Sequence, residues 1–242
     1  MHYGPRIPQT GLQLCLDASN PKSYPGSGTT WYDISGNGRD FTCASTPTFN
    51  AQPVVGGYRQ PDSLDAVLFT GPASNSFGIT SSTGASFVFY CTNDSGTNKS
   101  AFKWYMDGAS HGLTRGYFAH LPWGNYQIYF DTNGSTSTGS GGGRLNTGNP
   151  GSIINYFWTF AFTKSADGAT MKIYMDGEEE ASRTNAGACP TLNSTAATVG
   201  GDDYYTSGWD AKMGVFLCYN RELSAAEVLQ ITNAYRYRDG GS

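Results

Sequence analysis

The chain has 242 residues and a formal net charge of −4, and 14% of its residues are charged while another 14% are aromatic. Because the balance is mildly acidic and no run of basic residues occurs, a nucleic-acid-binding surface is not expected, and no apolar stretch reaches the roughly 18 residues that a membrane span requires. The 32 glycines and many aromatics, set against few charged residues, are typical of an all-β protein.

The N-terminal residues 1–11 are predicted to form an extended arm, because Pro5 and Pro8 disfavour regular structure. This segment lacks the apolar core of a signal peptide, so we expect the protein to be made and folded in a cytosol. Residues 11–17 alternate apolar and polar side chains, as in a half-buried strand. The Gly- and Pro-rich residues 20–40 are predicted to form a long ordered loop.

Short strands are predicted at regular spacing through the middle of the chain. The clearest covers residues 156–162, where Trp158, Phe160 and Phe162 share one face. The low-complexity residues 132–152 are interpreted as an excursion between neighbouring strands rather than as a domain boundary. Strands are predicted at 66–69, 86–91, 101–106, 116–121, 126–130, 156–162, 171–175, 197–199 and 215–219.

The pair Asp176-Gly177 is a strong hairpin signal, because both residues tolerate the positive φ of a turn that matches strand twist. With about ten or more short strands, the chain has enough for two packed antiparallel sheets. We therefore predict a single sandwich domain over residues 12–238.

One helix is predicted, at the C-terminal end of this domain. Ser224 and Glu227 have the spacing of a capping box, in which each side chain bonds the backbone N–H of the other residue. Apolar residues then recur at helical spacing and form one stripe that can pack on the sandwich. The pattern predicts a helix over residues 224–238, followed by a tail at 239–242.

The five cysteines are widely spaced, and no two of them form a CxxC pair, so a zinc site is not expected. Those that lie inside apolar strand-like runs are interpreted as small buried hydrophobic residues. The cysteines are Cys15, Cys43, Cys91, Cys189 and Cys218.

Three stretches carry a resemblance to a known family: residues 11–38, residues 158–177 with the sequence YMDG at their end, and residues 199–227 with YNRELSAAE. Together they resemble the laminin G-like/pentraxin-like group of the concanavalin A-like lectin/glucanase superfamily. The resemblance implies an all-β fold, a two-sheet antiparallel β-sandwich or jelly roll with a short C-terminal α-helix.

Residues 20–38 and 120–131 are also similar to segments of virion proteins of tailed bacteriophages, especially marine phages. This similarity implies a component of the virion surface, either a capsid decoration protein or a fibre or tail appendage. The expected partners are then other virion proteins and further copies of the chain in a symmetric oligomer, and neither nucleic acid nor a membrane.

An enzymatic function is not expected. Glycosidases of this superfamily use carboxylates in an E-x-D-x-x-E pattern, which this sequence lacks. Its acidic cluster at residues 178–180 places consecutive side chains on opposite faces, so we interpret it as a solvated hairpin. His120, beside Pro122 and Trp123, is interpreted as a packing or hydrogen-bonding residue, and no catalytic residue is assigned.

A calcium site at the rim of the sandwich is implied by the family resemblance, with Asp202, Asp203 and Asp210 as its candidate oxygen ligands. The family pattern has an acidic residue where this chain has Gly214, and this difference weakens the assignment. The alternative is that the aspartates satisfy backbone amides in turns. No other cofactor is expected.

An aromatic binding platform is the second candidate site. Tyr204, Tyr205 and Trp209 lie in a polar, Gly-containing loop, and exposed aromatic rings stack on sugars or anchor protein interfaces. The alternative is that these rings fold back over the core. Trp31 and Trp123 are interpreted as structural, because Gly and Pro neighbours fix them.

Two functions are compatible with these features. The first is a non-enzymatic structural or binding protein of a bacteriophage virion surface with a lectin-like fold. The second is a glycan-binding lectin that mediates adhesion to carbohydrate on the host cell surface.

Overall fold

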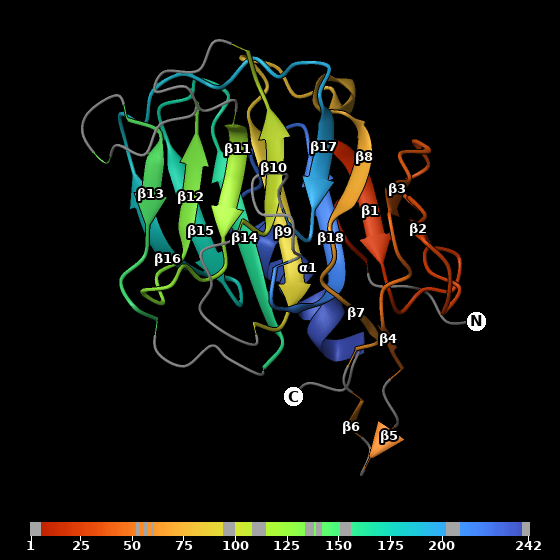
Figure 1. Ribbon diagram of the computed structural model, residues 1–242. Helices are drawn as coiled ribbons and strands as arrows, with labels where there is room; N and C mark the ends of the chain where they lie inside the picture. Colours follow the sequence, from red (N-terminus) through yellow and green to blue (C-terminus); the bar gives the residue numbers. More distant parts are fainter. Residues whose placement is uncertain are drawn as a thin grey trace.

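Two antiparallel sheets stack face to face and enclose the main hydrophobic core (Figure 1). The structure is a computed structural model that describes residues 6–51, 54–55, 58–59, 61–93, 100–107, 115–133, 138, 142–150, 156–201 and 209–238. Each sheet has eight strands, and a two-stranded hairpin of β5 (Val54–Val55) and β6 (Tyr58–Arg59) lies apart from them. The predicted all-β sandwich is confirmed.

The two sheets draw their strands from all parts of the chain. The first sheet contains β1 (Leu12–Asp17), β4 (Phe49–Asn50), β7 (Ser63–Asp65), β9 (Ala85–Cys91), β14 (Trp158–Lys164), β15 (Met171–Met175), β16 (Glu178–Arg183) and β18 (Lys212–Tyr219). The second contains β2 (Thr30–Trp31), β3 (Phe41–Cys43), β8 (Phe69–Ala73), β10 (Phe102–Tyr105), β11 (Arg115–His120), β12 (Tyr129–Thr132), β13 (Arg144–Asn146) and β17 (Ala196–Val199). A short 3-10 helix, η1 (Ser74–Phe77), follows β8.

Strand order brings distant segments side by side. The first sheet has the order β16-β15-β14-β9-β18-β7-β4, and β1 also pairs with β18. The second has the order β13-β12-β11-β10-β17-β8-β3-β2. In each sheet, strands far apart in sequence are neighbours, so the fold depends on long-range pairing.

The core between the sheets is largely aromatic. The ring centroid of Phe87 on β9 lies 4.6 Å from that of Phe102 on β10, in the opposite sheet. Phe89 and Phe216 lie side by side within the first sheet, with their ring centroids also 4.6 Å apart. All four are fully buried, and burying a phenylalanine side chain contributes about 1.5–3 kcal/mol.

The predicted hairpin is confirmed, since β15 and β16 pair on either side of Asp176 and Gly177, whose φ angles are 50° and 90°. The strand predicted at 66–69 is wrong for its first three residues. Residues 66–68 instead form the connection that crosses the edge of the sandwich, from β7 in the first sheet to β8 in the second.

Two predicted loops each contain a short strand. β2 lies within residues 20–40 and pairs with β3, and β13 lies within residues 132–152 and pairs with β12. The strand predicted at 126–130 begins only at Tyr129, because residues 123–127 form a tight turn in which Tyr126 has a φ of 62°.

The helix α1 (Ala225–Arg238) covers the outer face of the first sheet (Figure 1). Its buried stripe of Val228, Ile231 and Tyr235 packs against Tyr174 of β15 and Leu217 of β18. Within the described residues, no helix or third sheet covers the outer face of the second sheet. On that face, Tyr129, Arg144 and Asn146 at the β12–β13 edge are partly exposed, whereas Lys103 and Phe118 on β10 and β11 are buried.

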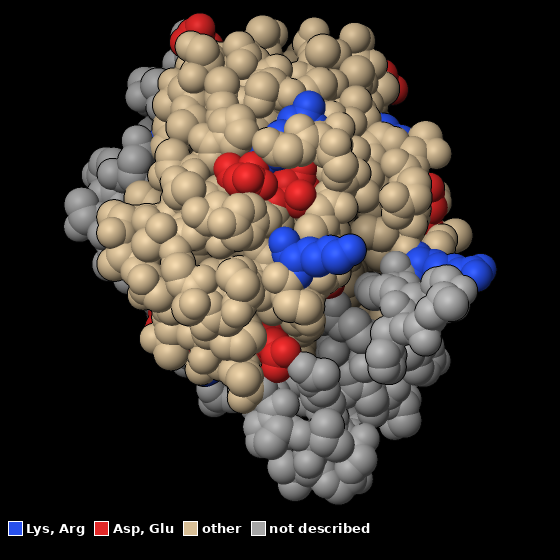
Figure 2. Space-filling model, turned by 90° about the vertical axis from the view of Figure 1, so that its right-hand side faces the viewer, with Lys and Arg blue, Asp and Glu red and all other residues tan. Residues whose placement is uncertain are grey.

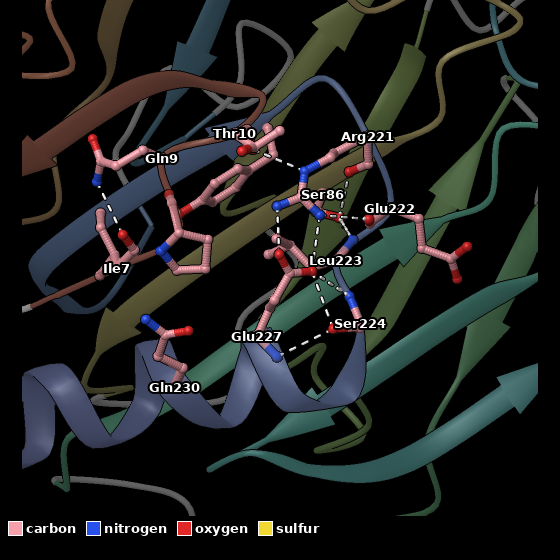
Figure 3. Close-up of polar contacts among 12 residues, drawn as sticks. Ile7, Gln9, Thr10, Ser86, Arg221, Glu222, Leu223, Ser224, Glu227 and Gln230 are labelled. Carbon is pink, nitrogen blue, oxygen red and sulfur yellow. Dashed lines mark hydrogen bonds and ion pairs between the residues drawn. The ribbon is translucent and has the colours of Figure 1, made fainter.

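Arg221 joins the start of α1 to the N-terminal segment (Figure 3). Its Nε donates to the carbonyl of Thr10 at 2.8 Å, while Nη1 and Nη2 donate to the two carboxylate oxygens of Glu227 at 2.8 and 2.6 Å. Ser224 and Glu227 form the predicted capping box, with backbone-to-side-chain bonds of 3.0 and 3.3 Å.

The N-terminal segment is held against the sandwich over its described part. The Tyr219 hydroxyl donates to the carbonyl of Pro8 at 3.1 Å, and the Gln230 amide donates to the carbonyl of Arg6 at 2.9 Å. Residues 6–10 of the predicted arm are thus bound to the domain itself. Residues 1–5 and the predicted tail at 239–242 lie outside the described residues.

Replacing Glu227 by Gln is expected to lower the free energy of unfolding by about 1–2 kcal/mol at pH 7. Hydrogen bonds from Arg221 lower the pKa of Glu227 from 4.5 to about 2. Since the folded-state pKa lies below the ordinary value, this stabilisation is complete above about pH 4.5 and is lost as the pH falls toward 2.

Urea unfolding at pH 7 and at pH 2.5–3 would test this expectation. The two proteins should differ at pH 7, and the difference should be clearly smaller at the lower pH, where part of the stabilisation has been lost. Glu180→Gln, at an exposed site on β16, is the control and should match the unchanged protein throughout. A difference for Glu227→Gln that stays constant with pH would contradict the assignment.

All five cysteines are free. Cys15, Cys91 and Cys218 are buried in strands, which confirms their interpretation as small hydrophobic residues.

Candidate functional site

The outer face of β10–β13 carries charged and aromatic side chains. Alternate residues of these strands, such as Phe102, Trp104, Tyr117 and Phe130, belong to the core between the sheets. Because successive side chains of a strand point to opposite faces, the residues between them lie on the outer face. These outer residues are Lys103, Phe118, His120, Tyr129, Asp131, Arg144 and Asn146.

A pocket of about 300 Å³ opens on this face. Its aromatic wall contains His120, whose ring centroid lies 4.3 Å from that of Trp123 and 6.1 Å from that of Tyr129. Trp123 and Tyr129 are half-buried, so each ring keeps part of its surface open to a ligand. Arg115 and Arg144 complete the lining.

Trp123 is held in place by a turn that Trp209 supports from the core. The Trp123 N–H donates to the carbonyl of Gln127 at 2.9 Å, and the Tyr126 N–H donates to the carbonyl of Trp123 at 2.8 Å. From the core side, Trp209 Nε1 donates to the carbonyl of Leu121 at 2.7 Å. The backbone on both sides of the Trp123 ring is therefore fixed by hydrogen bonds.

The two arginines give the pocket its charge. Arg144 makes a bidentate pair with the fully buried Asp131, with Nε donating to Oδ1 at 2.7 Å and Nη2 donating to Oδ2. The guanidinium of Arg144 lies over the ring of Tyr129, 4.7 Å from its centroid, and that of Arg115 lies over Phe118 at the same distance.

Burial raises the pKa of Asp131 to about 6, although the hydrogen bonds and charge of Arg144 oppose this shift. The carboxylate is therefore still mainly ionised at pH 7. Because it is fully buried, Asp131 serves to orient the guanidinium of Arg144 rather than to contact a ligand itself.

Amide side chains surround the Tyr129 hydroxyl at the rim of the pocket. Asn125 Nδ2 donates to this hydroxyl at 2.9 Å, and the hydroxyl donates to Gln127 Oε1 at 2.7 Å. Asn146 Nδ2 also donates to Gln127 Oε1, at 3.3 Å. Such polar groups beside open ring faces are the combination that fixes the orientation of a small polar ligand.

The predicted aromatic platform is only partly described. Tyr204 and Tyr205 lie outside the described residues. Trp209 lies in the core with 1% of its surface exposed, where its ring meets Phe89 edge-on. The alternative that the ring folds back over the core therefore holds for Trp209, because its N–H finds an acceptor there.

The predicted calcium ligands are also not brought together within the described part of the chain. Asp202 and Asp203 lie outside it, and Asp210 is exposed. The residues that are described contain no group of three or more His, Cys, Asp or Glu side chains that could hold a metal ion. The calcium site stays a prediction.

The interpretation of Trp123 as structural missed its place in the pocket, whereas Trp31 is fully buried as predicted. His120 packs against aromatic neighbours, as predicted, and also lines the pocket. The signal available in the sequence was the alternation over 117–121 and 129–131, which places His120 and Tyr129 on the face opposite the core residues. Alternation alone would place Arg115 with the core residue Tyr117, and Arg115 reaches the outer face only because the register of β10 and β11 shifts beside it.

A larger cavity of about 590 Å³ lies against β15 and β16. Its described lining residues include no aromatic ring, and the ammonium of Lys172 in it is already paired with Glu179 at 2.9 Å. The residues at 178–180 are exposed, as the predicted solvated hairpin requires. The smaller pocket, which is lined by aromatic rings and two arginines, is therefore the better candidate for selective binding of a ligand.

Charged side chains are sparse on the face of the molecule that contains β2 and β3. Figure 2 shows this face, where the Lys, Arg, Asp and Glu residues are few and are surrounded by uncharged ones. The part of this face that the structure describes thus offers no extended basic surface. None of the helices among the described residues is both long and apolar enough to cross a membrane.

Comparisons with known proteins agree with this architecture. The family model of the concanavalin A-like lectin/glucanases superfamily matches residues 65–229. A search of curated protein sequences found no match.

Solved structures share the fold at low sequence identity. The botulinum neurotoxin serotype G binding domain superposes with a TM-score of 0.63 at 14% identity, over 91% of this chain and 50% of that chain. The binding domain of Paraclostridial Mosquitocidal Protein 1 gives 0.61 at 13% identity, over 93% and 52%. Trypanosoma rangeli sialidase gives 0.60 at 14% identity, over 98% and 34%. This chain thus spans a third to a half of these proteins, and the likeness shows the fold alone.

Proposed function

Because the chain belongs to the concanavalin A-like lectin/glucanase superfamily, we propose that it is a non-enzymatic carbohydrate-binding domain whose sugar site is the pocket of Arg115, His120, Trp123, Tyr129 and Arg144. The observation that carries the proposal is the combination of partly open rings with guanidinium and amide donors around one pocket. Sugar rings present apolar C–H faces that pack on aromatic rings, and their hydroxyls accept hydrogen bonds from such donors.

The size and position of the pocket support this proposal. Small-ligand sites begin at about 300 Å³, so the pocket fits one or two sugar units rather than a large ligand. It lies at the β12–β13 edge of the second sheet, where Tyr129 and Arg144 are partly exposed. Two of the similar structures are themselves binding domains, which agrees with a binding role.

The carboxylate chemistry of the site also supports binding rather than hydrolysis. Most retaining glycosidases use two carboxyl groups about 5–5.5 Å apart. Among the described residues at the pocket, Asp131 supplies the carboxylate, and this group is buried and already bonded to Arg144. The proposal is therefore a lectin-like function.

A position on the surface of a bacteriophage particle is a second proposal, compatible with the first. It is supported by the similarity of residues 20–38 and 120–131 to segments of phage virion proteins. The second of these segments contains the turn that holds Trp123, so the same residues would serve both proposals. Mass spectrometry of purified particles would test it, and absence of the chain from them would contradict it.

A panel of immobilised neutral and acidic glycans, tested with and without Ca²⁺, examines the carbohydrate proposal directly. We expect the full chain to bind at least one class of glycan, with no need for Ca²⁺ at the pocket itself. Binding that requires Ca²⁺ would instead favour the loop of Asp202, Asp203 and Asp210. Failure to bind any glycan under either condition would contradict the carbohydrate-binding function.

A further inference from the structure

The turn beside the pocket exposes a further aromatic ring. The Trp123 N–H donates to the carbonyl of Gln127, and the Tyr126 N–H donates to the carbonyl of Trp123. These two bonds close a three-residue loop over residues 124–126, and every residue of this loop is exposed. Tyr126, the last of them, keeps 43% of its surface exposed, whereas Trp123, which precedes the loop, lines the pocket.

Tyr126 has a backbone conformation that disfavours a bulky side chain. Its φ is 62°, in the left-handed region, and the residue with this conformation in a three-residue hairpin loop is ordinarily glycine. Strain of this kind is found most often at functional sites. Among the residues that the structure describes, the Tyr126 hydroxyl makes no hydrogen bond and the ring stacks on no other aromatic ring. The fold therefore gains little from a tyrosine here.

Neither of the two loop residues between these rings has a free side chain that would cover them. Gly124 has no side chain, and Asn125 turns back to the pocket, where its Nδ2 donates to the Tyr129 hydroxyl at 2.9 Å. Gln127 accepts from the same hydroxyl through Oε1, and its Nε2 has no acceptor within the described part of the chain. This amide donor lies at the rim of the pocket, in the residue next to Tyr126, where a sugar hydroxyl can accept from it.

We propose that Tyr126 forms a second sugar-stacking platform, so that the site binds a glycan chain longer than a disaccharide in preference to a single terminal sugar. This inference rests on the proposed carbohydrate-binding function. The pocket of about 300 Å³ holds the first one or two units, and the next unit packs its apolar C–H face on the Tyr126 ring. The loop bonds fix the backbone of Tyr126 before the ligand arrives, which reduces the entropy lost on binding.

Calorimetric titration of the full chain with disaccharides and tetrasaccharides of the same sugar tests the inference. The probes are the malto-, chito- and galacturonate oligosaccharides, which cover neutral, N-acetylated and acidic sugars. In at least one series, the tetrasaccharide should bind roughly tenfold tighter than the disaccharide. Tyr126→Phe should keep this ratio, because the ring is retained.

Tyr126→Asn removes the ring and also relieves the backbone, because asparagine tolerates the left-handed conformation. It should bind the tetrasaccharide roughly tenfold more weakly than the unchanged protein does, and the disaccharide equally well. Its thermal unfolding midpoint should stay the same or rise. Since each ligand is compared between proteins, the statistical advantage of a longer chain cancels. Tyr32→Asn, at a tyrosine that is also 43% exposed, is the matched control and should change neither affinity.

The outcomes separate this inference from the proposed function. Equal affinity of the unchanged protein for the two lengths, or unchanged tetrasaccharide affinity in Tyr126→Asn, would overturn the second platform and leave sugar binding in the pocket intact. An equal loss for both lengths, or the same loss in Tyr32→Asn, would also overturn it, because the effect would then not depend on the added sugar units at this loop. Absence of binding to every glycan would overturn the carbohydrate function and this inference with it.

Discussion

Replacing Lys164 by Met is expected to lower the free energy of unfolding by about 3–5 kcal/mol. Lys164 lies at the end of β14, is fully buried, and its ammonium group donates to three backbone carbonyls. The acceptors are Gly168 at 2.8 Å, Gly187 at 2.9 Å and Ala186 at 3.2 Å. Met fills much of the same space but has no donor, so the buried carbonyl oxygens would lose their shared partner.

Chemical denaturation would measure this effect, with Lys172→Met as the matched control. The side chain of Lys172 is 30% exposed and its ammonium makes a surface pair with Glu179, which typically contributes less than about 1 kcal/mol. A loss for Lys164→Met no larger than that for the control would show that the three carbonyl contacts contribute little to stability.

Replacing Trp123 by Ala is expected to weaken binding of any sugar held in the pocket by about 2 kcal/mol, or roughly thirtyfold in affinity. The indole of Trp123 supplies open ring surface at the pocket. Because Trp123 is half-buried in a turn at the edge of the sheet, the substitution should leave the fold intact, which its thermal unfolding curve would verify.

Tyr32→Ala is the control for Trp123→Ala, since Tyr32 is an aromatic side chain with 43% of its surface exposed elsewhere on the domain. It should bind sugar as the unchanged protein does. Unchanged affinity of Trp123→Ala, or an equal loss in Tyr32→Ala, would count against stacking in the pocket. Trp209→Ala is not informative for contact, because this buried residue acts through stability.

Local sequence signals were sufficient for the elements that depend on nearby residues. The hairpin at Asp176-Gly177 and the helix that begins after Ser224 are both defined by residues within a few positions of each other. By contrast, β2 and β13 are short edge strands within Gly-rich stretches. They form because β3 and β12 offer them unpaired backbone groups, which no local pattern reveals.

The contrast between local signals and long-range contacts also explains which parts of the site could be predicted. Trp123 and Trp209 both lie in polar segments with Gly or Pro nearby, so the local sequence does not separate a core indole from a surface indole. The difference arises from a long-range contact, since Trp209 finds its acceptor at Leu121, a residue 88 positions earlier. The charged outer face likewise becomes visible only when the register of β10–β13 is known.

The location of the bound sugar tests the central claim most directly. An NMR titration of isotope-labelled protein with an oligosaccharide that it binds should shift the indole N–H signal of Trp123 and the backbone amides of residues 115–120 and 144–146. Signals of α1 and of the first sheet should stay in place. Shifts confined to residues 202–210 or to the first sheet, with Trp123 unchanged, would contradict a sugar site on the outer face of the second sheet.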